Sequence, residues 1–186
     1  MDVYQAALVV SNILCSGLFL YISLVFLRVY LRVRVEYLAL FSASFASLMV
    51  SQVASALSNM VIEPKLSLTL FTLSSSLASG GFLIMLFSIL SSGKEEAFAL
   101  LPSLPILVSL PDVSAFLLSL IVAALTHGGH LRGYLVVLSL THLARGLSSL
   151  LMPMGVGVHL LLISEASKTL ATLLFAIYHL GKVIRL

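Results

Sequence analysis

Long apolar segments, each bounded by charged residues, glycine or proline, recur along this chain of 186 residues. A helix needs about 20 predominantly apolar residues to cross the roughly 30 Å hydrocarbon core of a bilayer. The segments that reach this length are 4–30, 36–61, 66–91, 133–152 and 157–182. The sequence therefore predicts an all-α, polytopic transmembrane helical bundle that forms a single domain over residues 1–186.

Composition argues against a water-soluble fold. Hydrophobic residues make up 60% of the chain and charged residues only 9%, whereas a soluble domain normally carries about 25% charged residues. We therefore expect a multi-pass protein of the cell membrane, with the lipid bilayer as its first partner. Its basic residues lie singly or in small groups at the ends of apolar segments. This placement is typical of orientation signals and headgroup contacts, and it argues against a nucleic-acid partner.

The segment 97–126 leaves the number of crossings open. It is either one long helix, which gives six crossings, or two short helices broken at Pro111-Asp112, which gives seven. Each half alone is shorter than the about 20 residues that span a bilayer. Length alone therefore favours a single crossing.

The distribution of basic residues favours seven crossings instead. Cytoplasmic ends of transmembrane helices carry an excess of Lys and Arg. The cluster of Arg28, Arg32 and Arg34 would then be cytoplasmic, which places the N-terminus outside. Only with seven crossings do Arg132 and the basic C-terminal tail reach the same side. We therefore predict about seven helices, with the N-terminus out and the C-terminus in.

Two parts of the sequence resemble each other. The matching positions are Tyr37 and Tyr134, Ser42 and Ser139, Ser44 and Thr141, and Ser51 and Ser148. Residues 74–79 match residues 167–172 in the same way. These pairs indicate a parallel repeat with halves 1–92 and 112–186 joined by a linker helix at 96–110, a 3+1+3 arrangement known among transporters. Chance similarity between helices rich in Leu and Ser is the alternative.

Polar residues of the second apolar segment recur at helical spacing. Its serines follow one another at steps of three and four, at Ser44, Ser47, Ser51, Ser55 and Ser58. Small hydroxyl residues let membrane helices pack closely, so this face is predicted to be a packing face, with a ligand-lining face as the alternative. Gln52 and Asn59 are seven residues apart and share a second face. They are the side chains of this segment that we expect to contact a ligand.

The most informative residues are ionisable side chains in the last two apolar segments. His142 and Arg145 are three residues apart, as are Glu165 and Lys168, so each pair shares one helix face. A charge at mid-membrane costs at least about 2.5–3.5 kcal/mol, so such residues normally turn inward and pair. We predict a buried network of these four residues. It is either a site for a ligand, an ion or a proton, or a structural lock between two helices.

No catalytic signature occurs in the sequence. There is no nucleophile elbow, no HExxH and no phosphate loop, so we do not expect an enzyme. Asp112 and the other acidic residues outside the last segment are assigned to turns or termini. This assignment leaves Glu165 as the single carboxylate expected inside the membrane.

Histidines raise the question of a haem. His142 and His179 lie on neighbouring antiparallel helices of the predicted bundle and are weak candidates for the axial ligands of a b-type haem. Arg145, one turn from His142, argues against this. His127 and His130 lie in a turn without a nearby carboxylate or cysteine, which makes a poor metal site. We therefore favour no cofactor and no metal.

Three functions remain open. The first is a transporter-like or receptor-like unit that binds a small molecule or ion in a polar site between the last two helices. The second is an accessory structural subunit of a larger membrane complex, with a membrane-protein partner or a second copy of the chain. The third is a haem-b electron carrier.

Overall fold

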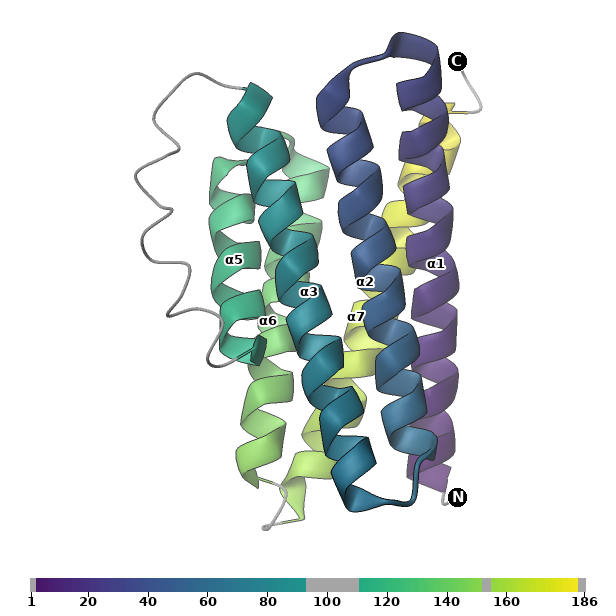
Figure 1. Ribbon diagram of the computed structural model, residues 1–186, viewed down its shortest axis with the longest axis vertical. Coiled ribbons are helices and arrows are strands. Elements are labelled where there is room, and N and C mark those ends of the chain that lie inside the picture. Colours follow the sequence, from purple (N-terminus) through teal and green to yellow (C-terminus); the bar gives the residue numbers. More distant parts are fainter. Residues whose placement is uncertain (1–2, 93–110, 152–154, 184–186) are drawn as a thin grey trace.

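The computed structural model describes residues 3–92, 111–151 and 155–183, and every regular element in these ranges is an α-helix. The helices are α1 (Val3–Val33), α2 (Glu36–Met60), α3 (Pro64–Ser92), α5 (Pro111–Leu125), α6 (Gly129–Leu151) and α7 (Val156–Val183) (Figure 1). All except α5 are long and apolar enough to cross a membrane. The prediction of an all-α bundle with long apolar helices is confirmed.

The ambiguous segment is described only in its second half. That half is the separate helix α5, which begins at Pro111, the break that the sequence predicts. The predicted linker helix at 96–110 lies outside the described residues, so the total of seven helices stays a prediction.

Proline and left-handed backbone conformations mark several helix ends. Pro64 and Pro111 stand first in α3 and α5, where a missing N–H is harmless and the fixed φ suits a helix start. After α1, Arg34 has a φ of 56° and its N–H donates to the Tyr30 carbonyl at 2.7 Å. Gly155, with a φ of 74°, precedes α7, and glycine adopts this conformation without strain.

The six described helices form a closed ring in the order α1, α2, α3, α5, α6, α7, with α7 packed against α1 (Figure 1). Contacts give the direction of each helix. For example, α1 and α7 run the same way, because Ser11 meets Thr169 and Cys15 meets Thr172 one turn later. In the ring as a whole, α1, α3, α5 and α7 point one way and α2 and α6 the other.

Aromatic side chains fill the centre of the ring. The rings of Tyr134 and Phe175 stack with centroids 4.4 Å apart, and Phe45 stacks on both. Phe19 packs against Phe45 from α1 with centroids 6.1 Å apart. These contacts join α1, α2, α6 and α7 through one apolar core.

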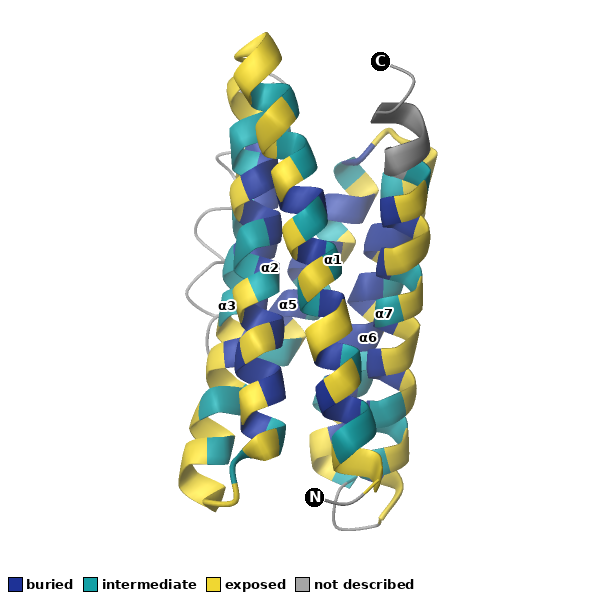
Figure 2. Cartoon of the chain, turned by 90° about the vertical axis from the view of Figure 1, so that its right-hand side faces the viewer, coloured by how far each residue is buried: buried dark blue, intermediate teal, exposed yellow. Residues whose placement is uncertain are grey.

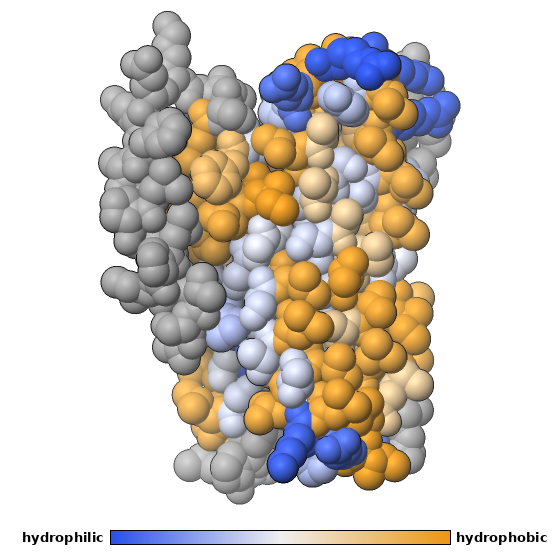
Figure 3. Space-filling view, viewed as in Figure 1, coloured by the Kyte–Doolittle hydropathy of each residue, from blue (hydrophilic) through white to orange (hydrophobic). Residues whose placement is uncertain are grey.

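The outside of the bundle is also apolar. Exposed residues lie on the outward faces of the helices, and buried residues line the inward faces (Figure 2). Hydrophobic side chains cover much of the flank, and strongly hydrophilic ones gather at the two ends (Figure 3). Such a surface is stable in lipid rather than in water, where an extended apolar flank would be exposed at a large free-energy cost.

The serine face of α2 packs against α3. The Ser47 hydroxyl donates to the Leu77 carbonyl at 2.8 Å, and the Ser51 hydroxyl donates to the Ser74 carbonyl at 2.8 Å. The backbones approach so closely that a Cβ added at Gly81 would lie 3.0 Å from the Ser44 carbonyl oxygen. Ser47 and Ser51 thus pack α2 against α3, as the packing-face interpretation predicts for this part of the serine face.

Candidate functional site

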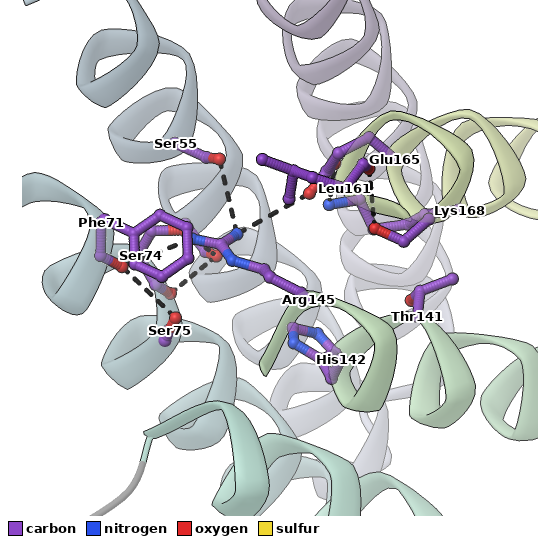
Figure 4. A network of polar contacts seen from close by, with 12 residues as sticks. Ser55, Phe71, Ser74, Ser75, Thr141, His142, Arg145, Leu161, Glu165 and Lys168 are labelled. Carbon is purple, nitrogen blue, oxygen red and sulfur yellow. Dashed lines mark hydrogen bonds and ion pairs between the residues drawn. The ribbon is translucent and has the colours of Figure 1, made fainter. Parts of the chain in front are cut away.

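Arg145 lies at the centre of a group of polar contacts inside the ring (Figure 4). Its side chain is 2% exposed. Its guanidinium lies 3.6 Å from Asp112 Oδ1 and 3.8 Å from Glu165 Oε1, and it donates to Ser55 Oγ at 3.4 Å. It also donates to the Phe71 carbonyl at 3.4 Å and lies 4.1 Å from the centre of the Phe71 ring. One side chain of α6 thus contacts α2, α3, α5 and α7.

Glu165 and Lys168 form an ion pair within α7. Both side chains are almost fully buried. Because they are three residues apart, the pair is formed on one helix face and neutralises itself without a neighbouring helix. Glu165 nevertheless also faces Arg145, so this carboxylate connects α7 to α6.

Asp112 completes the charged part of the site, contrary to its assignment to a turn outside the membrane. Its carboxylate lies 3.7 Å from His142 Nδ1 and 3.6 Å from Arg145 Nε, and it accepts a hydrogen bond from Ser75 Oγ at 2.9 Å. Its side chain is 12% exposed. The assignment of Asp112 to a turn is therefore wrong, because it lies in the first turn of α5 and shares Arg145 with Glu165.

The error about Asp112 has a physical reason. The sequence assignment treats Pro111-Asp112 as a turn at the bundle end, but α5 begins at Pro111 opposite the middle of α6. Two signals in the sequence indicated that Asp112 belongs to a helix and has a buried cation as its partner, although neither gives the height of α5 against α6. Pro followed by Asp is typical of the first turn of a helix. In addition, Arg145 and Lys168 are two buried cations, and Glu165 alone cannot balance both.

Two buried amide side chains have polar atoms without hydrogen-bond partners. Asn12 of α1 is 0% exposed, and neither its Oδ1 nor its Nδ2 has a partner. Gln52 of α2 is 1% exposed, and its Oε1 has no partner. Gln52 is one of the predicted ligand-contacting residues. Asn12 was not singled out, although an Asn inside an apolar segment is costly to bury and is a signal for such a role.

Contacts between helices place Asn12 at the level of the charged residues. Cys15 Sγ lies 3.8 Å from Thr172 Oγ1, and α1 and α7 run in the same direction. Asn12 lies one turn before Cys15, and Lys168 lies one turn before Thr172. The residues of the two pairs therefore lie at matching heights, with Asn12 at the height of Lys168.

Gln52 lies at the same height on α2. Ser16 Oγ donates to the Met49 carbonyl at 3.4 Å, and α1 and α2 run in opposite directions. One turn before Ser16 on α1 therefore corresponds to one turn after Met49 on α2. These positions are Asn12 and Gln52.

We call this set of side chains the polar layer. It consists of Asn12, Gln52, Ser55, Ser75, Asp112, His142, Arg145, Glu165 and Lys168. Every described helix contributes at least one member. The carboxylates of Asp112 and Glu165 balance the cations of Arg145 and Lys168, so the layer has no net charge when His142 is neutral.

The remaining predicted site residues lie outside the polar layer. Asn59 donates to the Ser55 carbonyl of its own helix at 2.9 Å and lies near the end of α2. Position 179 follows Lys168 by eleven residues on α7, or about 16 Å at 1.5 Å per residue. His142 belongs to the polar layer, as Lys168 does, so it is separated from position 179 by a similar distance along the bundle axis. The structure therefore gives the haem hypothesis no support. Among the described residues, no group of three or more His, Cys, Asp or Glu side chains is placed to hold a metal ion.

Together these features define an α-helical bundle of membrane type with an ionisable centre. Residues 7–96, just under half of the chain, match a protein family described as "Family of unknown function (DUF5985)". Comparison with curated proteins and with solved structures gave no match. The similarity covers α1 to α3, and therefore Asn12 and Gln52, whereas the charged residues of the polar layer lie beyond it.

Proposed function

We propose that this chain is a multi-pass protein of the cell membrane that binds a small polar molecule or ion in the polar layer, as a transporter or receptor does. The main support is Asn12, whose buried amide has no partner at the height of the ion pairs. An unsatisfied buried donor or acceptor costs about 1–3 kcal/mol. A ligand or an ordered water that supplies these hydrogen bonds removes that cost.

The charge balance of the polar layer favours one class of ligand. The layer is neutral when His142 is neutral, so a single added charge would stand unbalanced in a region of low dielectric constant. A neutral or zwitterionic molecule adds no net charge. The contacts of Arg145 also support such a ligand. They are 3.4–3.8 Å long, whereas charge-assisted hydrogen bonds are typically 2.7–2.9 Å, so the guanidinium can still donate to a polar group of a ligand.

We further propose seven crossings with the N-terminus outside and the C-terminus in the cytoplasm. Two described features support this arrangement. The exposed Arg28, Arg32 and Arg34 lie at the end of the ring where α6 begins with Arg132. In addition, α3 and α5 run in the same direction, as they do when an additional crossing at 96–110 separates them.

The ring order and helix directions also support the proposed parallel repeat. With halves 1–92 and 112–186, α1, α2 and α3 stand opposite α5, α6 and α7 in the ring. Equivalent helices run in the same direction, as a two-fold axis along the bundle requires. Such internal repeats are common in transporters, whose substrate sites lie at the repeat interface.

Native mass spectrometry of the purified chain tests the binding function. We expect a bound mass that survives gentle detergent removal from the wild-type protein. Asn12→Leu should reduce its occupancy at least about tenfold, because both amide hydrogen bonds are lost. Asn59→Leu is the matched control, since this amide bonds to its own helix outside the polar layer. Absence of a bound mass, or equal occupancy in both variants, would overturn the proposal.

The role of an accessory structural subunit is a second candidate. The Glu165–Lys168 pair supports it, because two charges that neutralise each other within one helix can serve packing alone. In this case the purified wild-type chain carries no small ligand, and solubilisation in a mild detergent recovers it with a stoichiometric membrane-protein partner. Native mass spectrometry reports both outcomes in one spectrum.

A further inference from the structure

A groove opens beside the polar layer where α5 begins. Its volume is about 460 Å³, within the range of small-molecule sites. Its walls come from the first turn of α5 and one face of α6, with residues Pro111, Asp112, Val113, Leu143, Leu147 and Leu150 among them. Leu147 and Leu150 are 44% and 74% exposed. The groove therefore faces outward, on the flank that we assign to the hydrocarbon region.

The inner end of the groove is polar. Asp112 and His142 both line it and both belong to the polar layer. All three contacts described for the Asp112 carboxylate, with His142, Arg145 and Ser75, are made by Oδ1. No described contact involves its other oxygen, Oδ2, so we infer that Oδ2 is available to accept a hydrogen bond from a molecule in the groove.

Asp112 is also the accessible end of the charged group. Its side chain is 12% exposed, whereas those of Arg145 and Glu165 are 2% exposed. A molecule that enters from the side thus meets this carboxylate first. Ser149 also lines the groove, but its hydroxyl donates to the Arg145 carbonyl of its own helix, and most other lining residues are apolar. The molecule therefore meets one charged acceptor at the inner end of a largely apolar groove.

We propose that the groove takes a neutral lipid-soluble alcohol from the bilayer, with its hydroxyl group donating a hydrogen bond to Asp112. A hydroxyl supplies the donor that Oδ2 lacks, and an aliphatic body fits the leucine-lined walls. With His142 neutral, an ammonium group would add an unbalanced charge to the layer, and a carboxylate or phosphate would stand against Asp112 itself. This inference rests on the proposed function, because the groove reaches the polar layer at Asp112 and His142, across the ring from Asn12, and it names a ligand class for that side of the layer.

Photolabelling of the full-length chain in phosphatidylcholine nanodiscs tests the inference. The probe is hexadecanol with a photoreactive diazirine in its chain, and labelled peptides are mapped by mass spectrometry. We expect labelling to concentrate on the α6 peptide that contains Leu143, Leu147 and Leu150. Unlabelled hexadecanol should compete. Hexadecyl methyl ether should compete about tenfold less well, because it lacks a donor for a charged acceptor.

A variant that narrows the groove gives the second readout. A Cβ at Gly146 would lie 3.4 Å from Asp112 Cβ, an ordinary contact distance, so Gly146→Ala fills space beside the carboxylate without a clash. Labelling of the α6 peptide should fall at least about fivefold in this variant. Gly17→Ala is the matched control, because a Cβ there meets nothing within 4 Å. Equal elution and equal helical content show that both variants are folded.

The outcomes separate this inference from the proposed function. Even labelling of all lipid-facing helices, equal competition by the ether, or unchanged labelling of Gly146→Ala would each overturn the alcohol site. If native mass spectrometry then still finds a mass that depends on Asn12, the polar layer binds a different ligand and the proposed function stands. If neither experiment detects a ligand, both proposals fall.

Discussion

The two halves of the ring use similar helices in different ways. In the half formed by α1 to α3, serines pack helices together, as where Ser51 bonds to the Ser74 carbonyl. In the half formed by α5 to α7, ionisable side chains meet instead. If the proposed repeat register is continued, Leu48 of α2 corresponds to Arg145 of α6, and Thr72 of α3 corresponds to Glu165 of α7. One half is therefore stabilised by close packing and the other by electrostatic pairing.

This difference places the polar layer at the junction of the halves. The charges come from α5, α6 and α7, but Arg145 reaches Ser55 and the Phe71 carbonyl of the other half. Asp112 likewise accepts a hydrogen bond from Ser75. The hydroxyl-rich half thus supplies neutral donors and acceptors that complete the coordination of charges held by the other half. A site built in this way needs both halves.

The largest expected effect comes from removing one buried charge. Glu165→Leu leaves Lys168 without its partner and Arg145 with Asp112 as its one described charged partner. Breaking a buried ion pair in this way typically costs about 3–5 kcal/mol. Thermal unfolding in detergent, followed by circular dichroism, should show a large decrease in stability for this variant.

The corresponding position in the other half provides the control. Thr72 is exposed and bonds to the Leu68 carbonyl of its own helix. Thr72→Leu should therefore leave the unfolding temperature almost unchanged. Equal losses in Glu165→Leu and Thr72→Leu would contradict the contrast between the two halves.

The second effect tests close packing in the other half. A Cβ at Gly81 would lie 3.0 Å from the Ser44 carbonyl oxygen and 3.3 Å from the Leu48 side chain, so Gly81→Ala forces the α2–α3 seam apart. Overpacking of this kind costs about 1–3 kcal/mol. Gly133→Ala on α6, where an added Cβ meets nothing within 4 Å, should have little effect in the same unfolding assay. A stable Gly81→Ala protein would show that the seam is looser than the structure indicates.

The third effect concerns the junction itself. Ser75→Ala removes the hydroxyl that donates to Asp112, and Asp112→Asn removes the charge that faces Arg145. Each change should lower the free energy of unfolding by about 1–3 kcal/mol, because a buried charged group loses a partner. The double variant should lose less than the sum, since both changes act on one network of contacts around Asp112. Additive losses would mean that Ser75 and Asp112 contribute to stability independently of each other.

The sequence predicts the residues that α6 and α7 contribute to the polar layer better than those that α1 and α5 contribute. Inward pairing of His142, Arg145, Glu165 and Lys168 follows from the cost of a charge in hydrocarbon, and the structure brings all four into one layer. The helix ranges also follow from apolar length. Such arguments depend on local sequence, so they hold wherever a segment is long and its charges are few.

The roles of Asp112 and Asn12 are not predicted by the sequence, because they depend on the relative positions of the helices along the bundle axis. The role of Asp112 requires that α5 begins opposite the middle of α6, which no property of the 111–125 segment alone determines. The unpaired amide of Asn12 likewise becomes significant only once Cys15 and Thr172 fix the height of α1 against α7. Interhelical registration is a property of the packed ring.

The smallest expected effect compares two serines at matching positions of the proposed repeat. Ser51 donates to the Ser74 carbonyl of the neighbouring helix, whereas Ser148 donates to the Arg145 carbonyl of its own helix. Hydrogen bonds between membrane helices contribute about 0.6 kcal/mol on average, so Ser51→Ala should lose about that much. Ser148→Ala should lose less, because its bond joins no second helix. Equilibrium unfolding by steric trapping in bicelles resolves differences of this size. A larger loss in Ser148→Ala would show that hydroxyl groups also hold the charged half together, and that the two halves differ less than their contacts indicate.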